Sequence, residues 1–119
     1  MMRPADDLPA VYLCSTPVDF RKGIRGLAVL VETQLQRDPF AEGLFVFCNR
    51  QRTSLKILYW ERNGFCLWQK RLEKERFFWP RGESEAVIEL TAQQLNWLLE
   101  GYDINRMKPH QALHFCSVL

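Results

Sequence analysis

Basic side chains that can bind an anion are concentrated in one stretch of the chain, from Arg50 to Arg81. Nine Lys and Arg residues against three Glu residues give this stretch a net charge of +6, whereas the whole chain carries +2. The residues before it sum to −1 and the residues after it to −3. Such a region attracts a polyanion and speeds its capture. The pattern indicates where a partner would bind, and it leaves open what is done to that partner.

A β-hairpin is predicted inside this basic stretch. Residues 55–61 and 65–72 are rich in aliphatic and aromatic side chains, and Asn63-Gly64 between them is the preferred pair for a two-residue type I′ turn. On that register facing residues have numbers that add to 127, which places Lys56 opposite Arg71. Like charges in register repel, so we expect a neutral residue at either position to leave stability unchanged or slightly higher.

An anion such as phosphate would relieve this repulsion. Arg50 and Arg52 precede the first strand of the hairpin and are expected at the same end of it. A second group of cations follows the first strand of the chain, at residues 21–25. The candidate DNA- or anion-binding residues are Arg50, Arg52, Lys56, Arg71, Lys70, Arg21, Lys22 and Arg25.

The group at residues 21–25 falls in the opening turns of a predicted helix. Thr16-Pro17 is typical of a helix start, and we expect the helix to run to about Gln36. Cations and glycines both disfavour a helix start. Two interpretations remain open. Either Gly23 and Gly26 let the helix pack closely on the sheet, with the arginines solvated or paired to Asp19, or the cations and free backbone N–H groups bind an anion.

Large aromatic side chains accompany the basic ones. Strand alternation sends Tyr59 and Trp68 to one sheet face and Trp60 and Phe65 to the other. One face must pack on the helices. The other set is a stacking platform for exposed bases, a protein interface or cover for a second core layer. The candidate aromatic interface consists of Trp60, Phe65, Trp68 and Trp79.

Catalytic and metal-binding patterns are weak. The carboxylates are scattered, so no strand offers the acid pair that a two-metal nuclease needs. His110, His114 and Cys116 have the spacing of half a zinc site, but an upstream Cys-x-x-Cys is missing, and ordinary tail residues are the favoured interpretation. The chain also lacks a nucleophile motif and a Gly-rich phosphate loop. We expect no enzymatic activity, no cofactor and no metal.

Length and composition indicate one soluble domain of 119 residues. We expect an N-terminal extension at 1–10, a core at 11–103 and a tail at 104–119. No apolar run is long enough to span a membrane, and the first ten residues lack the apolar core of a signal peptide. The four cysteines are isolated, which favours reduced, buried thiols and a cytoplasmic location without membrane contact.

The predicted elements define the fold class. Besides the hairpin, strands are expected at 11–14, 44–48 and 86–90. A capping box at Thr91 to Gln94 opens a short C-terminal helix that Gly101 stops. The result is an α+β domain built on an antiparallel β-meander, with one long helix after the first strand and a short C-terminal helix.

Ordered blocks of residues across 11–110 resemble a known family. The match covers nearly the whole chain, which makes it more specific than one short motif. The blocks include Val11-Tyr12-Leu13, Asp19-Phe20-Arg21-Lys22-Gly23-Ile24-Arg25-Gly26-Leu27, Lys56-Ile57-Leu58-Tyr59-Trp60, Gly64-Phe65-Cys66-Leu67-Trp68 and Leu98-Leu99-Glu100-Gly101-Tyr102-Asp103. They resemble the TnpB-type accessory proteins, products of the second open reading frame in bacterial insertion sequences of group sixty-six.

The resemblance implies a small accessory protein encoded beside a separate, larger transposase and needed for efficient transposition. The leading hypothesis is a non-catalytic protein that contacts DNA phosphates through the basic hairpin end and meets the transposase, or itself, through apolar surface. The alternative is an adaptor whose basic patch docks an acidic region of the transposase without touching DNA.

Overall fold

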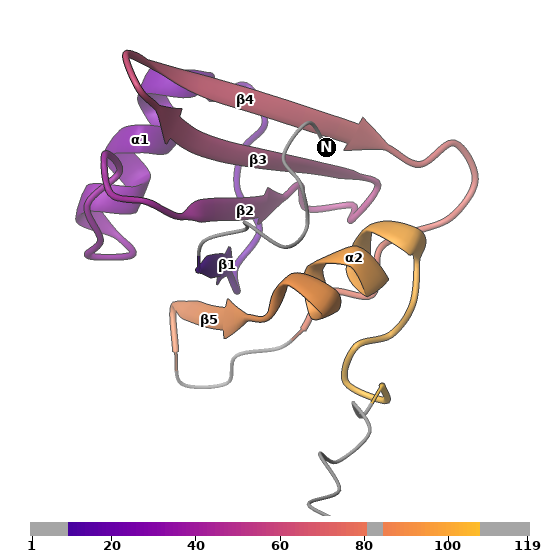
Figure 1. The fold of residues 1–119 in the computed structure, drawn as a ribbon. Helices are drawn as coiled ribbons and strands as arrows, with labels where there is room; N and C mark the ends of the chain where they lie inside the picture. Colours follow the sequence, from indigo (N-terminus) through magenta and orange to yellow (C-terminus); the bar gives the residue numbers. More distant parts are fainter. Residues whose placement is uncertain (1–9, 81–84, 108–119) are drawn as a thin grey trace, which may run out of the picture.

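The structure is a computed structural model that describes residues 10–80 and 85–107 (Figure 1). Its elements follow the chain in the order β1 (Val11–Cys14), α1 (Ile24–Thr33), β2 (Leu44–Cys48), β3 (Ser54–Glu61), β4 (Gly64–Arg71), β5 (Val87–Leu90) and α2 (Ala92–Glu100). The α+β class is confirmed, and the predicted strands match within two residues at each end.

One five-stranded sheet has the strand order β4-β3-β2-β1-β5. β1 and β2 run parallel, with Val11 beside Leu44, while every other neighbouring pair is antiparallel. The sheet is therefore mixed, and the predicted antiparallel meander is wrong for β1 and β2. Parallel neighbours need a crossover connection, and α1 supplies it.

Helix α1 is shorter than predicted. The Val18 N–H donates to the Cys48 carbonyl at 2.9 Å, so the chain continues past the end of β2 where a helix was expected to start. The Asp19 carboxylate then accepts the Arg21 N–H at 2.9 Å and closes a turn. The helix begins only at Ile24 and ends at Thr33. Its predicted start at Thr16-Pro17 is thus wrong, and Arg21 and Lys22 precede the helix.

Helix α2 begins and ends as its sequence predicts. The Gln94 N–H donates to the Thr91 hydroxyl at 3.0 Å, and the Thr91 N–H donates to the Gln94 side chain at 2.9 Å. Gly101 adopts φ +95° and caps the other end. The capping box and the glycine stop are confirmed.

The β3–β4 hairpin is confirmed, but its register differs from the prediction. Trp60 faces Phe65, and facing residues have numbers that add to 125. The turn therefore falls on Arg62-Asn63, with Arg62 at φ +55°, instead of on Asn63-Gly64. Lys56 faces Gln69 and Arg71 faces Ser54, so the expected Lys56–Arg71 repulsion is absent. A shift of two residues keeps each side chain on its predicted face, which is why the hydrophobic pattern accepts both registers.

Both faces of the sheet are buried. One face packs against α2 and the segment at 77–79, through residues such as Leu13, Ile57 and Leu95. The opposite face packs against α1, through residues such as Leu27, Phe47 and Leu58. The domain therefore has three layers, with the sheet between two separate cores (Figure 1). Most of the aromatic side chains pack in these cores: Trp68 and Trp79 on the α2 side, and Phe65 on the α1 side. Of the alternatives for the two aromatic faces, cover for a second core layer therefore accounts for most of them.

Candidate nucleic-acid interface

The turn that connects β2 to β3 holds two arginines on a well-fixed backbone. Asn49 Oδ1 accepts the N–H groups of Thr53 and Ser54 at 2.9 and 3.1 Å, and its Nδ2 donates to the Thr53 hydroxyl at 3.0 Å. The Arg52 N–H donates to the Asn49 carbonyl at 3.1 Å. Arg50 and Arg52 are exposed. This turn, residues 49–54, positions their guanidinium groups at the end of the sheet.

Arg52 adopts a backbone conformation that side chains disfavour. Its φ is +62°, in the left-handed region, which costs a residue with a Cβ about 1–2 kcal/mol. Glycine would adopt this conformation without that cost. Arg62 shares this conformation at the hairpin turn, with φ +55°, so the strain at Arg52 does not by itself identify a binding residue.

The segment after β4 runs along this turn and adds further cations. The N–H groups of Leu72 and Phe77 donate to the carbonyls of Thr53 and Arg52, each at 2.8 Å. Phe77 and Trp79 are buried, and Trp79 Nε1 donates to the Cys14 carbonyl at 2.9 Å. In an extended chain the alternate residues face outward. Arg76 and Phe78 are accordingly exposed, Phe78 to 52%.

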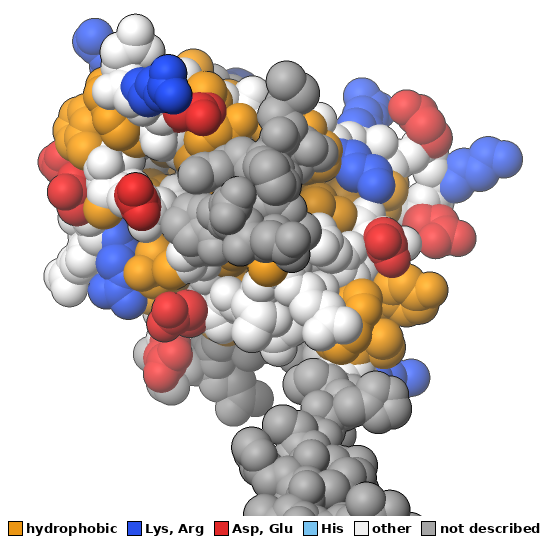
Figure 2. Space-filling model, viewed as in Figure 1, with side chains coloured by type: hydrophobic (Ala, Val, Ile, Leu, Met, Phe, Trp, Pro, Cys, Tyr) orange, Lys and Arg blue, Asp and Glu red, His pale blue; other side chains and the backbone are white. Residues whose placement is uncertain are grey.

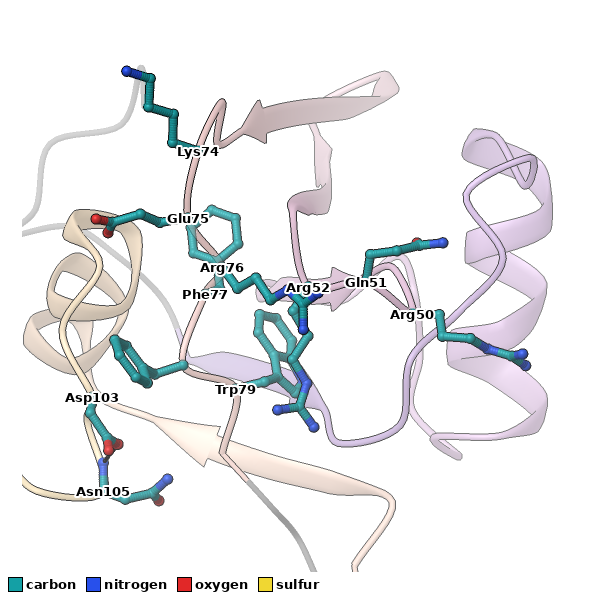
Figure 3. A pocket seen from close by; sticks show the side chains of 11 residues that line it. Arg50, Gln51, Arg52, Lys74, Glu75, Arg76, Phe77, Trp79, Asp103 and Asn105 are labelled. Carbon is teal, nitrogen blue, oxygen red and sulfur yellow. Dashed lines mark hydrogen bonds between the residues drawn. The ribbon is translucent and has the colours of Figure 1, made fainter.

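Together the turn and this segment form a groove with a volume of about 1120 Å³. Figure 3 shows Arg52, Arg76 and Trp79 in its centre, Lys74 at one margin and Arg50 at the other. Four cations therefore line it against two acids, and one acid, Asp103, already pairs with Arg106 at 3.6 Å. Its lining residues are Arg50, Gln51, Arg52, Lys74, Glu75, Arg76, Phe77, Phe78, Trp79, Asp103 and Asn105.

A second hollow of about 580 Å³ shares Arg50 and Gln51 with this groove and extends it toward residues 17–21. Arg21 there forms a two-pronged salt bridge with Asp19, with nitrogen–oxygen distances of 2.6 and 2.9 Å. Hydrogen bonds from Arg21 lower the pKa of Asp19 to about 2 and the same contacts raise the pKa of Arg21. The pairing with Asp19 favoured by one interpretation of this cluster is therefore present, and it removes most of the net charge that Arg21 would add.

Lys56 does not belong to an exposed anion site. Its side chain is 6% exposed, and its Nζ donates to the carbonyls of Phe20 and Lys22 at 3.0 and 3.1 Å. The Nζ also lies 4.7 Å from the centre of the Phe20 ring. Lys56 lies on the α1 side of the sheet, where its side chain anchors the loop that precedes α1. Its predicted role in anion binding is corrected accordingly.

The remaining predicted cations divide between structural and surface positions. Lys70 Nζ donates to the Leu99 carbonyl at 2.8 Å, which neutralises the C-terminal end of α2. Arg71 is exposed at the end of β4, and Lys22 and Arg25 are exposed near the start of α1. None of these four residues lines the groove or the second hollow.

The two glycines of this cluster do not bring α1 closer to the sheet. A Cβ at Gly26 would meet the Lys22 side chain at 3.1 Å, and a Cβ at Gly23 would meet nothing within 4 Å. The interpretation that these glycines permit close packing on the sheet is therefore wrong. No strand atom is among the atoms that a Cβ at either glycine would meet first.

Two cations of the groove were not assigned to a site from the sequence. Lys74 and Arg76 lie within the basic stretch, and the alternation of Arg76 and Phe78 with two aromatic residues is the signal that indicates their outward direction. Asp103 and Asn105 reach the groove from the chain after α2, and no local pattern predicts that contact.

The predicted aromatic interface is only partly at the surface. Trp79 is 4% exposed and Trp68 is half-buried against the core on the α2 side. Trp60 and Phe65 are half-buried and join Phe40 in a three-ring cluster, with centroids 5.0 to 5.2 Å apart. Phe40 was not predicted to take part, because it lies in the turn after α1 and far away in sequence.

Cysteine and acidic side chains offer no metal centre within residues 10–80 and 85–107, where His, Cys, Asp and Glu nowhere gather in a group of three. His110, His114 and Cys116 lie outside the described residues.

Cys14 and Cys48 are buried free thiols, and burial raises both pKa values, that of Cys48 to about 12. None of the described helices could cross a membrane.

Comparison with known proteins identifies relatives over most of the chain. It is 36% identical over 102 residues to the uncharacterized protein y4hO of Sinorhizobium fredii (strain NBRC 101917 / NGR234), covering 86% of this chain and 88% of the relative. It is 33% identical over 98 residues to the uncharacterized protein y4jC of the same strain, covering 82% and 83%. No solved structure matches the chain significantly.

The family model of the IS66 Orf2-like proteins matches residues 9–109, which include both hollows and all seven elements. This confirms the resemblance found in the ordered sequence blocks, and it implies an accessory role in an insertion sequence. The chain belongs to the IS66 Orf2-like family.

Proposed function

We propose that this protein is a non-catalytic accessory protein of insertion-sequence transposition that contacts DNA phosphates through the groove between the 49–54 turn and residues 74–79. The observation that carries the proposal is that Arg50, Arg52, Lys74 and Arg76 line one groove, with Arg52 and Arg76 at its centre (Figure 3). These cations come from two chain segments that backbone hydrogen bonds hold together.

The chemistry of the lining suits a phosphate backbone. Arginine binds phosphate through two parallel N–H groups, and exposed cations release counterions from DNA when they bind. Phe78 offers an exposed ring beside these cations, on which an unstacked base can lie. The second hollow continues the basic path through Arg50 toward residues 17–21.

A salt series with purified protein and duplex DNA tests the proposal. The double variant Arg52→Gln, Arg76→Gln should reduce the salt slope of the logarithm of the binding constant by about one to two, because each lost phosphate contact removes about 0.9. Arg62→Gln is the matched control, since Arg62 is exposed at the hairpin turn and outside the groove. Equal slopes for the double variant and the control would contradict the proposal.

The same preparation tests the absence of catalysis. Supercoiled and linear DNA should remain uncut in the presence of Mg²⁺ or Mn²⁺. Cleavage that disappears when a single carboxylate is replaced would show that the protein is a nuclease.

Mixed polarity in the groove favours a second candidate. Glu75, Asp103 and Asn105 line it beside the cations, which suits an acidic protein segment that also donates hydrogen bonds. On this alternative the protein is an adaptor for the transposase. It predicts that the Arg52→Gln, Arg76→Gln variant loses capture of the transposase encoded by the same element, while the protein binds little DNA at any salt concentration.

A further inference from the structure

A third hollow, of about 400 Å³, lies between the outer side of α1 and the three-ring cluster. It shares no residue with the groove or the second hollow. Figure 2 shows hydrophobic side chains at the surface over the corner formed by α1 and the β3–β4 turn, with charged side chains beside them. Its lining residues are Ile24, Arg25, Ala28, Val29, Glu32, Pro39, Phe40 and Phe65.

Apolar side chains of this hollow are unusually exposed. Val29 and Phe40 are each 53% exposed and Ile24 is 39% exposed, which makes three of the five large hydrophobic side chains exposed in the described part of the chain. Helix α1 buries Leu27, Leu30 and Val31 in its own core, so Val29 is not needed there. A clustered apolar surface beside charged residues is typical of a protein interface.

The hollow carries one positive and one negative side chain, and their spacing along α1 favours one kind of partner. Arg25 and Glu32 lie at the two ends of a stripe on α1 that has Ala28 and Val29 in its middle. Seven helical residues span about 10.5 Å. Within residues 10–80 and 85–107, neither Arg25 nor Glu32 forms a salt bridge. The stripe is thus basic at one end, apolar in the middle and acidic at the other end.

Such a stripe is complementary to itself. If a second α1 packs antiparallel about a twofold axis between Ala28 and Val29, each Arg25 meets the other copy's Glu32, and each Val29 meets an Ala28. Interfaces of symmetric dimers have this property, because the same patch serves both copies. The rigid rings of Phe40 and Phe65 add apolar area at the margin.

We propose that this protein forms a twofold homodimer through the outer side of α1, with Arg25 of each copy paired to Glu32 of the other. The dimer surface is separate from the groove proposed for DNA, so this inference does not depend on that function. Ala28 is small and Val29 is a short aliphatic residue, so the two helices can approach closely.

Analytical ultracentrifugation of the full chain over a concentration series tests the dimer. Wild type should sediment as a dimer at micromolar concentration. Val29→Glu should be a monomer, because it places a carboxylate in the apolar centre. Gln93→Glu, an exposed change on α2, is the matched control and should remain dimeric. Circular dichroism verifies that each variant is folded.

Charge reversal tests the pairing itself. Arg25→Glu should raise the dimer dissociation constant at least about tenfold, because each new carboxylate meets Glu32 of the other copy. Adding Glu32→Arg should restore the dissociation constant to within about threefold of wild type. A wild-type monomer up to hundreds of micromolar, or a double variant as weak as Arg25→Glu, would overturn the proposal. The proposal would also be overturned if wild type captured the transposase and Val29→Glu abolished this capture without changing the oligomeric state.

Discussion

At the scale of single residues, Lys56 shows how one buried cation is accommodated. Removing an ammonium group from water is costly unless it finds partners. Lys56 finds two backbone carbonyls and the face of the Phe20 ring, and no buried side-chain nitrogen or oxygen in the described residues lacks a partner. The contact joins strand β3 to the loop before α1. Both carbonyls belong to residues just before α1, so the contact holds this loop against the sheet.

Lys56→Met should therefore lower the free energy of unfolding by about 1–3 kcal/mol, because it leaves two carbonyls without their donor. Arg71→Gln is the control, since Arg71 is exposed at the end of β4, and we expect a change within about 0.5 kcal/mol. Urea unfolding followed by tryptophan fluorescence measures both. Equal effects of the two changes would contradict the structural role of Lys56.

Arg52 combines strain with exposure, and two substitutions separate these properties. Arg52→Gly and Arg52→Ala both remove the guanidinium group, but only glycine tolerates φ +62°. The glycine variant should be more stable than the alanine variant by about 1 kcal/mol. Both should weaken DNA binding to the same extent. Equal stability in thermal unfolding would show that the turn relaxes instead of storing strain.

At the scale of elements, the helix ends differ in how well they are specified. Helix α2 has a complete capping box and was predicted closely, whereas α1 has Gly23 at its N-cap, no side-chain cap and no acidic residue in its first turn. The sequence favoured Thr16-Pro17 as a start because only local signals were visible. The Val18–Cys48 hydrogen bond, between the chain after β1 and the last residue of β2, is a long-range contact that no local signal shows.

The hairpin register illustrates the same limit. Registers that differ by two residues bury identical side chains, so the pattern of 55–72 cannot choose between them. The observed one brings Trp60 and Phe65 into edge contact at 5.0 Å and accepts Arg62 at a positive φ. The predicted Lys56–Arg71 pair depended on that choice. The exposed arginines of the 49–54 turn did not, since charge alone was sufficient to select Arg50 and Arg52 as candidates.

The missing cap of α1 gives a prediction at this scale. Gly23 is extended, and an added Cβ would meet open space, so Gly23→Asp can supply both a capping oxygen and a negative charge. It should raise the free energy of unfolding by about 0.5–1 kcal/mol. Gly23→Ala, which has no capping oxygen, is the control and should not reproduce the gain. Chemical denaturation of both variants decides whether the helix end is limiting.

At the scale of the whole molecule, the two proposed binding surfaces lie over opposite faces of the sheet. The groove is built on the 49–54 turn and the segment that covers the α2-side core, while the dimer surface is the outer side of α1. The described part of the chain is thus charged in one place and apolar in another. A sequence shows the charge as a run, but it shows the apolar surface only once the buried side of α1 is known.

Because the two surfaces share no residue, their functions should separate by mutation. The Arg52→Gln, Arg76→Gln variant should remain dimeric in ultracentrifugation and lose DNA binding. Val29→Glu should be a folded monomer that still binds a short duplex with the wild-type salt slope, because each copy carries its own groove. In cells both variants should lower transposition at constant protein level. If Val29→Glu also lost the salt-dependent binding of a short duplex, the groove would have to be shared between two copies, and the division of the molecule into two independent surfaces would be wrong.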